Sequence, residues 1–189
     1  MINSDVLNDW LPLMISVLAL FFSIFGFWWT HWRTGRLIVS SPRSFMAAET
    51  NEKIIVELPL SFYNEGAAAI VIDNLLLRAR QQNISRLFRF EYTRDELGGE
   101  THHWATQLAL AGREAVMKVF SFQVTKGETN LSAGTWDCAL FAKLNNELGY
   151  REVSRFKLNV SRLTSSFSAI DNTSAEYQAM MKRYTPAKR

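Results

Sequence analysis

Apolar positions follow two different periods along the chain, and the change comes near residue 33. From Leu11 to Trp29 no residue is charged, and Leu, Ile, Val, Phe, Met and Trp dominate. A helix of this length rises about 28 Å, close to the thickness of the hydrocarbon core of a bilayer. From Arg36 onward apolar and polar residues alternate with the period of two that is typical of β-strands. The pattern predicts a transmembrane helix over residues 11–32, after an N-terminal flank of residues 1–10, and then a β-domain.

Two other interpretations of the apolar stretch fit it less well. A core helix of a soluble domain carries a polar stripe every three or four residues, and here only Ser16 and Ser23 interrupt. A cleaved signal peptide begins with basic residues and ends at a small-residue cleavage site. This N-terminus instead carries Asp5 and Asp9, and the stretch ends in Phe-Trp-Trp-Thr-His-Trp. We therefore expect a permanent signal anchor.

The flanks of the helix predict its membrane interface and its orientation. Tryptophan prefers the headgroup region and positive charge stays on the cytoplasmic side. The residues expected at the interface are Trp10, Trp28, Trp29, Trp32, Arg33 and Arg36. Because the arginines, Arg43 included, follow the helix and the two acids precede it, we expect a single-pass protein of the inner (plasma) membrane. Its N-terminus would lie outside and its β-domain in the cytoplasm.

The alternating region predicts about seven short strands over residues 33–165. In the segment Lys53–Asn64, Val56, Leu58, Leu60 and Phe62 share one face, while Glu57, Pro59, Ser61 and Tyr63 share the other. Pro59 argues for an edge strand or a bulge, because proline cannot donate to a ladder. The other strands are expected near residues 36–42, 69–80, 85–92, 114–124, 135–144 and 152–160, with turns between them, one at Asn145-Asn146. No helical period separates them, so the pattern favours an antiparallel β-sandwich.

The segments Leu58–Ala79 and Leu108–Val124 resemble strands and Gly-containing turns of bacterial immunoglobulin-like sandwiches. The resemblance spans roughly residues 36 to 160 and implies the fold without an activity, because that fold serves many functions. The Cys…Trp…Cys pattern of antibody domains is missing. The expected fold class is therefore mainly β, an immunoglobulin-like antiparallel β-sandwich preceded by one transmembrane helix and followed by a short C-terminal helix.

That C-terminal helix is expected within the tail, residues 166–189. Thr173 and Glu176 have capping-box spacing. Tyr177, Met180, Met181 and Tyr184 then fall on one helical face, which could dock in a partner groove or lie on the membrane. Packing on the protein's own sandwich is the alternative.

His102, His103 and Trp104 form the second possible partner contact, in a loop expected from Thr93 to Gly112. Adjacent histidines on a strand point to opposite faces, so a shared metal ion would need Asp95, Glu96 or Glu100, without a recognised ligand spacing. An ordinary solvated loop is the alternative. Cys138 alternates with Trp136, Leu140 and Ala142 on an apolar face, so we expect a buried thiol rather than a nucleophile.

Cysteine count, net charge and the catalytic motifs that are missing limit the possible functions. A single cysteine excludes an internal disulfide, and a net charge of +3 is too small and dispersed to indicate nucleic-acid binding. Phosphate-binding, zinc-protease, hydrolase and kinase motifs are missing, so we expect no enzyme, cofactor or metal. The sequence favours a membrane-tethered interaction module that holds or recruits a protein partner at the lipid bilayer, as an accessory subunit of a membrane complex. The alternatives are a membrane-anchored ligand sensor and a metal-dependent hydrolase that uses His102 and His103.

Overall fold

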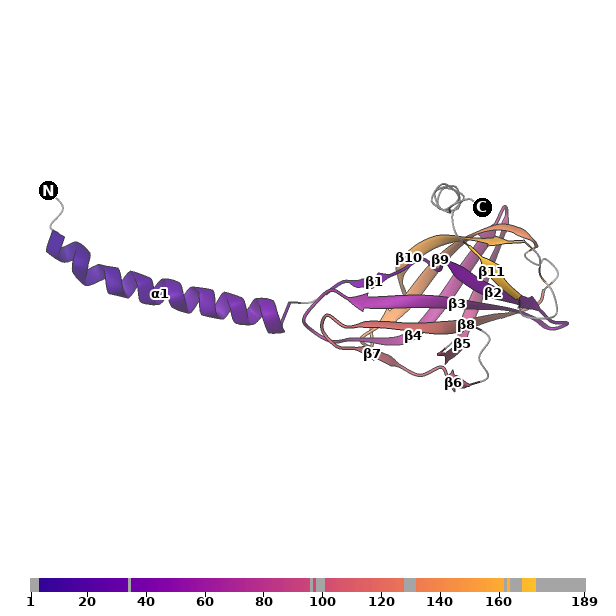
Figure 1. Ribbon diagram of the computed structural model, residues 1–189, viewed down its shortest axis with the longest axis horizontal. Coiled ribbons are helices and arrows are strands. Elements are labelled where there is room, and N and C mark those ends of the chain that lie inside the picture. The colour runs from indigo at the N-terminus through magenta and orange to yellow at the C-terminus, as the bar shows by residue number, and fades with distance from the viewer. Residues whose placement is uncertain are drawn as a thin grey trace, which may run out of the picture.

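The structure is a computed structural model of the 189-residue chain. It describes residues 4–33, 35–95, 97, 101–127, 132–161, 163 and 168–172. A long N-terminal helix leaves one end of an elongated β-domain (Figure 1).

Helix α1 spans Ser4–His31, and its large side chains from Trp10 onward are apolar and exposed. Its segment Trp10–His31 is long and apolar enough to cross a membrane. Two hydroxyl side chains within it bond back to the helix: Ser16 Oγ donates to the Pro12 carbonyl at 2.8 Å, and Thr30 Oγ1 donates to the Gly26 carbonyl at 2.8 Å. These bonds give the two hydroxyl groups a hydrogen-bond acceptor, which the hydrocarbon chains of a bilayer do not offer. The single N-terminal apolar helix is therefore confirmed.

The described part of the β-domain is one antiparallel sheet of 11 strands. They are β1 (Leu37–Val39), β2 (Ser44–Glu49), β3 (Lys53–Asn64), β4 (Ile70–Gln81), β5 (Ile84–Arg94), β6 (His102–Trp104), β7 (Leu108–Leu110), β8 (Ala115–Thr125), β9 (Gly134–Leu144), β10 (Arg151–Val160) and β11 (Ser168–Asp171). Neighbours follow the order β10-β9-β4-β5-β8-β3-β2-β11, while β1 pairs with β3, β6 with β5 and β7 with β4. The sheet curls until it nearly closes into a barrel.

In the described part of the chain, the two edges of the sheet meet without strand pairing along a seam between β10 and the β2–β11 edge. Asn172 bridges it, because its Nδ2 donates to the carbonyls of Lys157 (2.8 Å) and Pro42 (3.1 Å). Its Oδ1 accepts from the Asn159 backbone nitrogen at 3.0 Å. A side-chain amide carries the same donor and acceptor as a backbone amide, so Asn172 substitutes for a ladder pair. At the other end of the seam β1 lies beside β10.

The inner face of the curled sheet is the core. Alternate residues of each long strand point inward, and the largest fully buried side chains include Phe45, Phe62, Phe88, Phe120, Phe122 and Trp136. The rings of Phe62 and Phe120 meet edge to face with centroids 5.0 Å apart, a favoured aromatic geometry. The four residues expected to share the inner face of the β3 segment are all buried.

The structure differs from the sequence expectation in the way the strands assemble. Instead of two stacked sheets there is one continuous sheet that folds onto itself. An alternating strand buries one face in either architecture, so the pattern alone does not separate them. On one side of β3, residues 62–64 pair with β1 and residues 54–57 pair with β2. Pro59 lies in the gap between these two pairings, so on that side it has the edge position that proline requires.

Two segments are more ordered than expected. Residues 93–112, expected as a loop, contain β6 and β7. The sheet also continues past residue 165, where β11 pairs with β2 within the expected tail. The expected C-terminal helix lies in residues 173–189, outside the described part of the chain.

Candidate functional site

Three arginines gather on the outer face of the sheet because of its register. Arg78 on β4 lies opposite Ala139 on β9, which lies opposite Arg155 on β10. Two residues along β4, Arg80 lies opposite Asp137. Since side chains alternate between faces, these residues all project away from the core. The register thus joins basic residues that are far apart in the chain.

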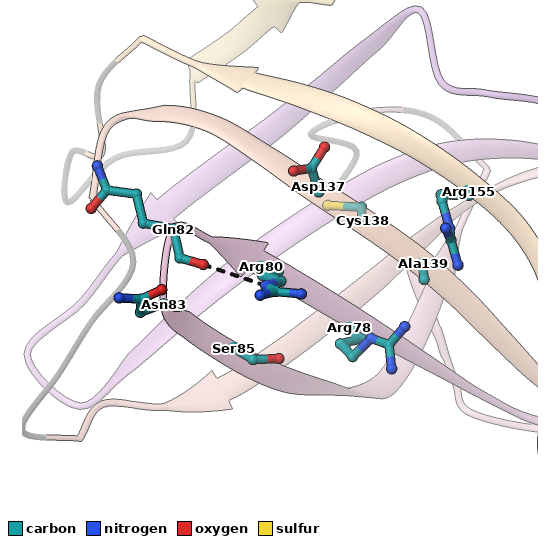
Figure 2. A pocket seen from close by; sticks show the side chains of 9 residues that line it. All are labelled: Arg78, Arg80, Gln82, Asn83, Ser85, Asp137, Cys138, Ala139 and Arg155. Atoms are coloured by element: carbon teal, nitrogen blue, oxygen red, sulfur yellow. Dashed lines mark hydrogen bonds between the residues drawn. The ribbon is translucent and has the colours of Figure 1, made fainter.

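The side chain in the middle of this row is short, which leaves a hollow of about 750 Å³. Ala139 contributes only a methyl group between the two long side chains of Arg78 and Arg155. The residues lining the hollow, shown in Figure 2, are Arg78, Arg80, Gln82, Asn83, Ser85, Asp137, Cys138, Ala139 and Arg155. We call this site the arginine hollow. It includes the β4–β5 turn, at the end of the barrel opposite α1 (Figure 1).

The arginines of the hollow differ in their partners. Arg155 donates from Nε and Nη2 to the two carboxylate oxygens of Glu152, both at 3.1 Å, and these hydrogen bonds raise the pKa of Arg155. Arg78 Nη2 lies 3.9 Å from the same carboxylate. Arg80 donates from Nε to the Gln82 carbonyl at 3.3 Å and forms no ion pair with a described residue. Arg80 is therefore the guanidinium with capacity for an external anion.

Cys138 borders the hollow, but its side chain belongs to the core. It is buried together with Trp136 and Leu140, as the alternation predicted. Burial, and secondarily the charge of Asp137, raises the pKa of the Cys138 thiol to about 12. Because a thiolate is the reactive species, this cysteine is unsuited to nucleophilic chemistry near neutral pH.

A second, smaller pocket of about 210 Å³ opens where β4 and β5 separate. Beyond Arg89, β5 pairs with β8 while β4 pairs with β7 and β9. His103, Lys118 and Phe120 are among the lining residues. We call it the fork pocket. It mixes apolar walls with a few polar groups, the usual make-up of a small-molecule site.

The histidine segment forms strand β6 rather than a loop. His102, His103 and Trp104 pair with Arg94, Thr93 and Tyr92. His103 Nε2 lies 3.7 Å from Asp95 Oδ2. Among the described residues no three His, Cys, Asp or Glu side chains lie close enough to hold a metal ion; Glu96 and Glu100 lie outside those residues. The structure thus brings His103 to the fork pocket without a metal-ligand set in the described part.

A buried polar cluster lies on the outer face of β3, β8 and β5. Glu57 is fully buried; its Oε1 accepts from Tyr92 Oη at 3.1 Å and lies 3.5 Å from Arg94 Nε. Glu57 Oε2, Arg94 Nε and Ser121 Oγ have no hydrogen-bond partner among the residues that the structure describes. The sequence placed Glu57 on this face but gave no sign of its burial.

The remaining candidates are distributed between α1 and the tail. Trp10, Trp28, Trp29 and Trp32 are exposed at the two ends of the apolar stretch. Arg33 stacks on Trp29, with its guanidinium carbon 4.3 Å from the ring centroid, and Arg36 is exposed after the helix. The tail residues Tyr177, Met180, Met181 and Tyr184 lie outside the described part of the chain.

Comparison with known proteins gives no assignment: no protein-family model and no curated protein matches the chain. The arginine hollow was missed from the sequence. Its signal was the repeat of Arg78 and Arg80 on one strand face, but the contribution of Arg155 depends on strand register.

Proposed function

We propose that this protein is a membrane-tethered interaction module. Helix α1 would hold it in the bilayer, and the barrel would hold or recruit a protein partner as an accessory subunit of a membrane complex. The observation that carries the proposal is the joint between α1 and the barrel, which fixes the position of the domain relative to its anchor.

That joint is bonded on both sides of Gly35. The Arg33 carbonyl accepts from the backbone nitrogens of Ala67 (3.0 Å) and Ala68 (3.4 Å), and the Arg36 carbonyl accepts from Glu65 at 3.2 Å. A Cβ on Gly35 would collide with the backbone of Gly66, so only glycine allows this close approach. The barrel is therefore docked on its helix rather than tethered through a free linker.

The same loop is organised from within by Asn64. Its buried side chain donates to the carbonyls of Ala68 (2.8 Å) and Ala111 (3.0 Å), and its Oδ1 accepts from the Gly66 nitrogen at 3.0 Å. These bonds join two loops at the helix end of the barrel. A module built in this way presents its opposite end at a constant height above the membrane.

At that opposite end lies the arginine hollow, the part of the described surface that we assign to the partner. Guanidinium groups bind carboxylates in a paired, directional geometry, and Arg80 has no acidic partner among the described residues. The proposed partner therefore presents an acidic segment to Arg80. Tethering then raises the effective concentration of this contact at the membrane.

For the topology we propose a cytoplasmic barrel, from the arginines that follow α1. A tag at the C-terminus should resist protease added outside intact cells. Digestion of the tag under those conditions would reverse the proposed topology.

The test of the proposed function is purification of tagged full-length protein in a mild detergent, followed by mass spectrometry of what accompanies it. A stoichiometric companion is expected with the wild type and with K53E, which changes an exposed charge outside the hollow. The companion should be lost with R80E. Purification of the wild type without any companion, or equal recovery with R80E, would contradict the proposed docking.

A ligand sensor is the second candidate, because the fork pocket has the form of a small-molecule site. Its polar lining includes His103, Lys118 and Gln107. A screen of small anionic and polar compounds by thermal shift of the full-length protein would test it. A ligand whose effect disappears in K118A would favour the sensor.

A further inference from the structure

The β9–β10 turn lies at the end of the barrel that carries α1, and it has the most exposed large apolar side chain of the described residues. Leu148 is 105% exposed, and Gly149 has no atom near the position of a Cβ. Single exposed leucines are common and need no explanation by themselves. The position and the rigidity of this turn are what distinguish it.

The first half of the turn is held in one conformation by bonds to β4. Asn145 donates from its backbone nitrogen to the Val71 carbonyl and accepts from the Val71 nitrogen through Oδ1, both at 2.8 Å. The Asn146 nitrogen donates to Asp73 Oδ2 at 2.6 Å. Asn145 and Asn146 have φ values of 48° and 60°, and the Glu147 nitrogen closes the turn on the Leu144 carbonyl at 2.8 Å. A tight turn with two left-handed residues, which asparagine tolerates well, thus leads directly into Leu148.

The strand that follows the turn adjoins the joint with α1. Gly35, Arg36 and Leu37 line one pocket together with Arg151 and Val153 of β10. Residues at the start of β10 therefore lie beside the residues that leave the membrane helix. Leu148 precedes them in the chain and belongs to the same end of the barrel.

The length of the apolar segment determines how close the helix end of the barrel lies to the bilayer. The apolar segment Trp10–His31 is about 33 Å long as a helix, enough to fill a hydrocarbon core of about 30 Å. Ala67 and Ala68 bond to Arg33, two residues past that segment. The headgroup layer adds roughly 5–7 Å on each side, so loops at this depth lie within it.

From these observations we infer that the β9–β10 turn is a second membrane contact, which inserts Leu148 into the lipid interface next to α1. Tyr150, also exposed, flanks it with an amphipathic ring of the kind that prefers this layer. The inference rests on the proposed membrane anchor. Two attachment points restrict tilting of the barrel about the joint.

The contact is apolar rather than electrostatic. At this end of the barrel the exposed arginines Arg36, Arg113 and Arg151 are accompanied by the exposed acids Glu65, Glu114 and Glu147, while Arg33 is half-buried with its guanidinium over the ring of Trp29. Equal numbers of both signs give no net attraction to anionic lipid. Insertion of Leu148 should therefore be insensitive to salt and to the anionic lipid content.

The experiment places an environment-sensitive fluorophore on single introduced cysteines of the full-length protein in phosphatidylcholine vesicles. The buried Cys138 thiol is protected from the labelling reagent. The positions are L148C, F21C in the centre of α1, and L87C as the matched control. Leu87 is also an exposed leucine, 50% exposed on β5, and it lies about 20 Å from the membrane end of the barrel by strand rise and tilt. Vesicles carry a quencher on the lipid chain, either near the headgroup or near the chain end.

The label at position 148 should be quenched most by the shallow quencher and the label at 21 most by the deep one, with no quenching at 87. Quenching at 21 without quenching at 148 would overturn the second contact and leave the anchor intact. Quenching at neither position would overturn the anchor and the contact that depends on it. A label at 148 that responds to protein concentration instead of lipid quencher would assign the turn to a second copy of the chain, and would also overturn the inference.

Discussion

Two ion-pair clusters on the outer face of the sheet differ in how much water reaches them. Glu57, which contacts Arg94 and Tyr92, is fully buried. Glu152, which contacts Arg155 and Arg78 of the arginine hollow, is solvated. A buried carboxylate loses its hydration and depends on its partners, but an exposed pair exchanges partners at little cost. The buried cluster of Glu57 therefore contributes to stability, while the solvated cluster of Glu152 is free to exchange a partner for a ligand.

The largest effect is expected from E57A. Breaking a buried ion pair by removing one partner costs about 3–5 kcal/mol, because the remaining charge is left uncompensated. The free energy of unfolding is measured by urea denaturation of the detergent-solubilised full-length protein, followed by the circular dichroism of the sheet.

The matched control is E152A, which removes the exposed carboxylate and should cost at most about 1 kcal/mol. The double variant E57M/R94M, which removes both buried charges, should recover much of the stability lost in E57A. Equal losses for E57A and E152A would remove the distinction between the two clusters.

The seam that joins the two sides of the barrel should show an intermediate effect. N172A removes three hydrogen bonds at the junction of β10 with the opposite edge, and a loss of about 1–3 kcal/mol is expected. Hydrogen exchange at the Asn159 amide, which donates to Asn172, should accelerate. The control N172D keeps the side-chain acceptor and loses the two donated bonds, so the Asn159 amide should stay more protected from exchange than in N172A. Equal exchange in the two variants would show that the seam forms without this side chain.

Substitution within the hollow should affect binding with little change in stability. R80E should weaken capture of the acidic partner at least tenfold, about 1.4 kcal/mol, while the midpoint of unfolding stays within the range of surface substitutions. A139F tests the same site without a charge change, because the ring would fill the floor between Arg78 and Arg155. Partner recovery is compared by quantitative mass spectrometry, and undiminished recovery with both variants would move the partner to another surface.

The smallest effect concerns Cys138. A thiol in an unfolded chain ionises near pH 8.5, but burial raises the pKa in the folded protein to about 12. The protonated thiol therefore favours the folded state fully below about pH 8.5, and this contribution is lost as pH rises towards 12. Iodoacetamide at pH 8 should leave the folded protein unmodified and react after denaturation; rapid labelling of the folded protein would contradict the burial.

The sequence predicted the elements with a strong period and missed those without one. The seven strands expected from alternation all occur, and Asn145-Asn146 forms the expected turn. Strands β2, β6, β7 and β11 have only three to six residues, too few for alternation to stand out from a loop. Their assignment depends on partner strands distant in the chain.

The features of the site that the sequence did not predict depend on which strands pair and in which register. Arg78 and Arg80 are visible as a pair on one face of a strand, but nothing local indicates that Ala139 separates Arg78 from Arg155. Glu57 was placed on the correct face, yet its burial depends on Tyr92 and Arg94 arriving from β5 across β8. The choice between a sandwich and a nearly closed barrel likewise depends on seam contacts such as those of Asn172.

Helix α1 is proposed to remain attached and to hold the barrel in the bilayer. A cleaved signal sequence can have the same length and apolar composition, so the two differ in whether the segment is retained. The most direct test is alkaline extraction of membranes from cells that produce the full-length protein, with intact-mass measurement of the recovered chain. The protein should stay in the membrane pellet and retain residues 11–32. A soluble product that begins after that segment would contradict the anchor and every proposal built on it.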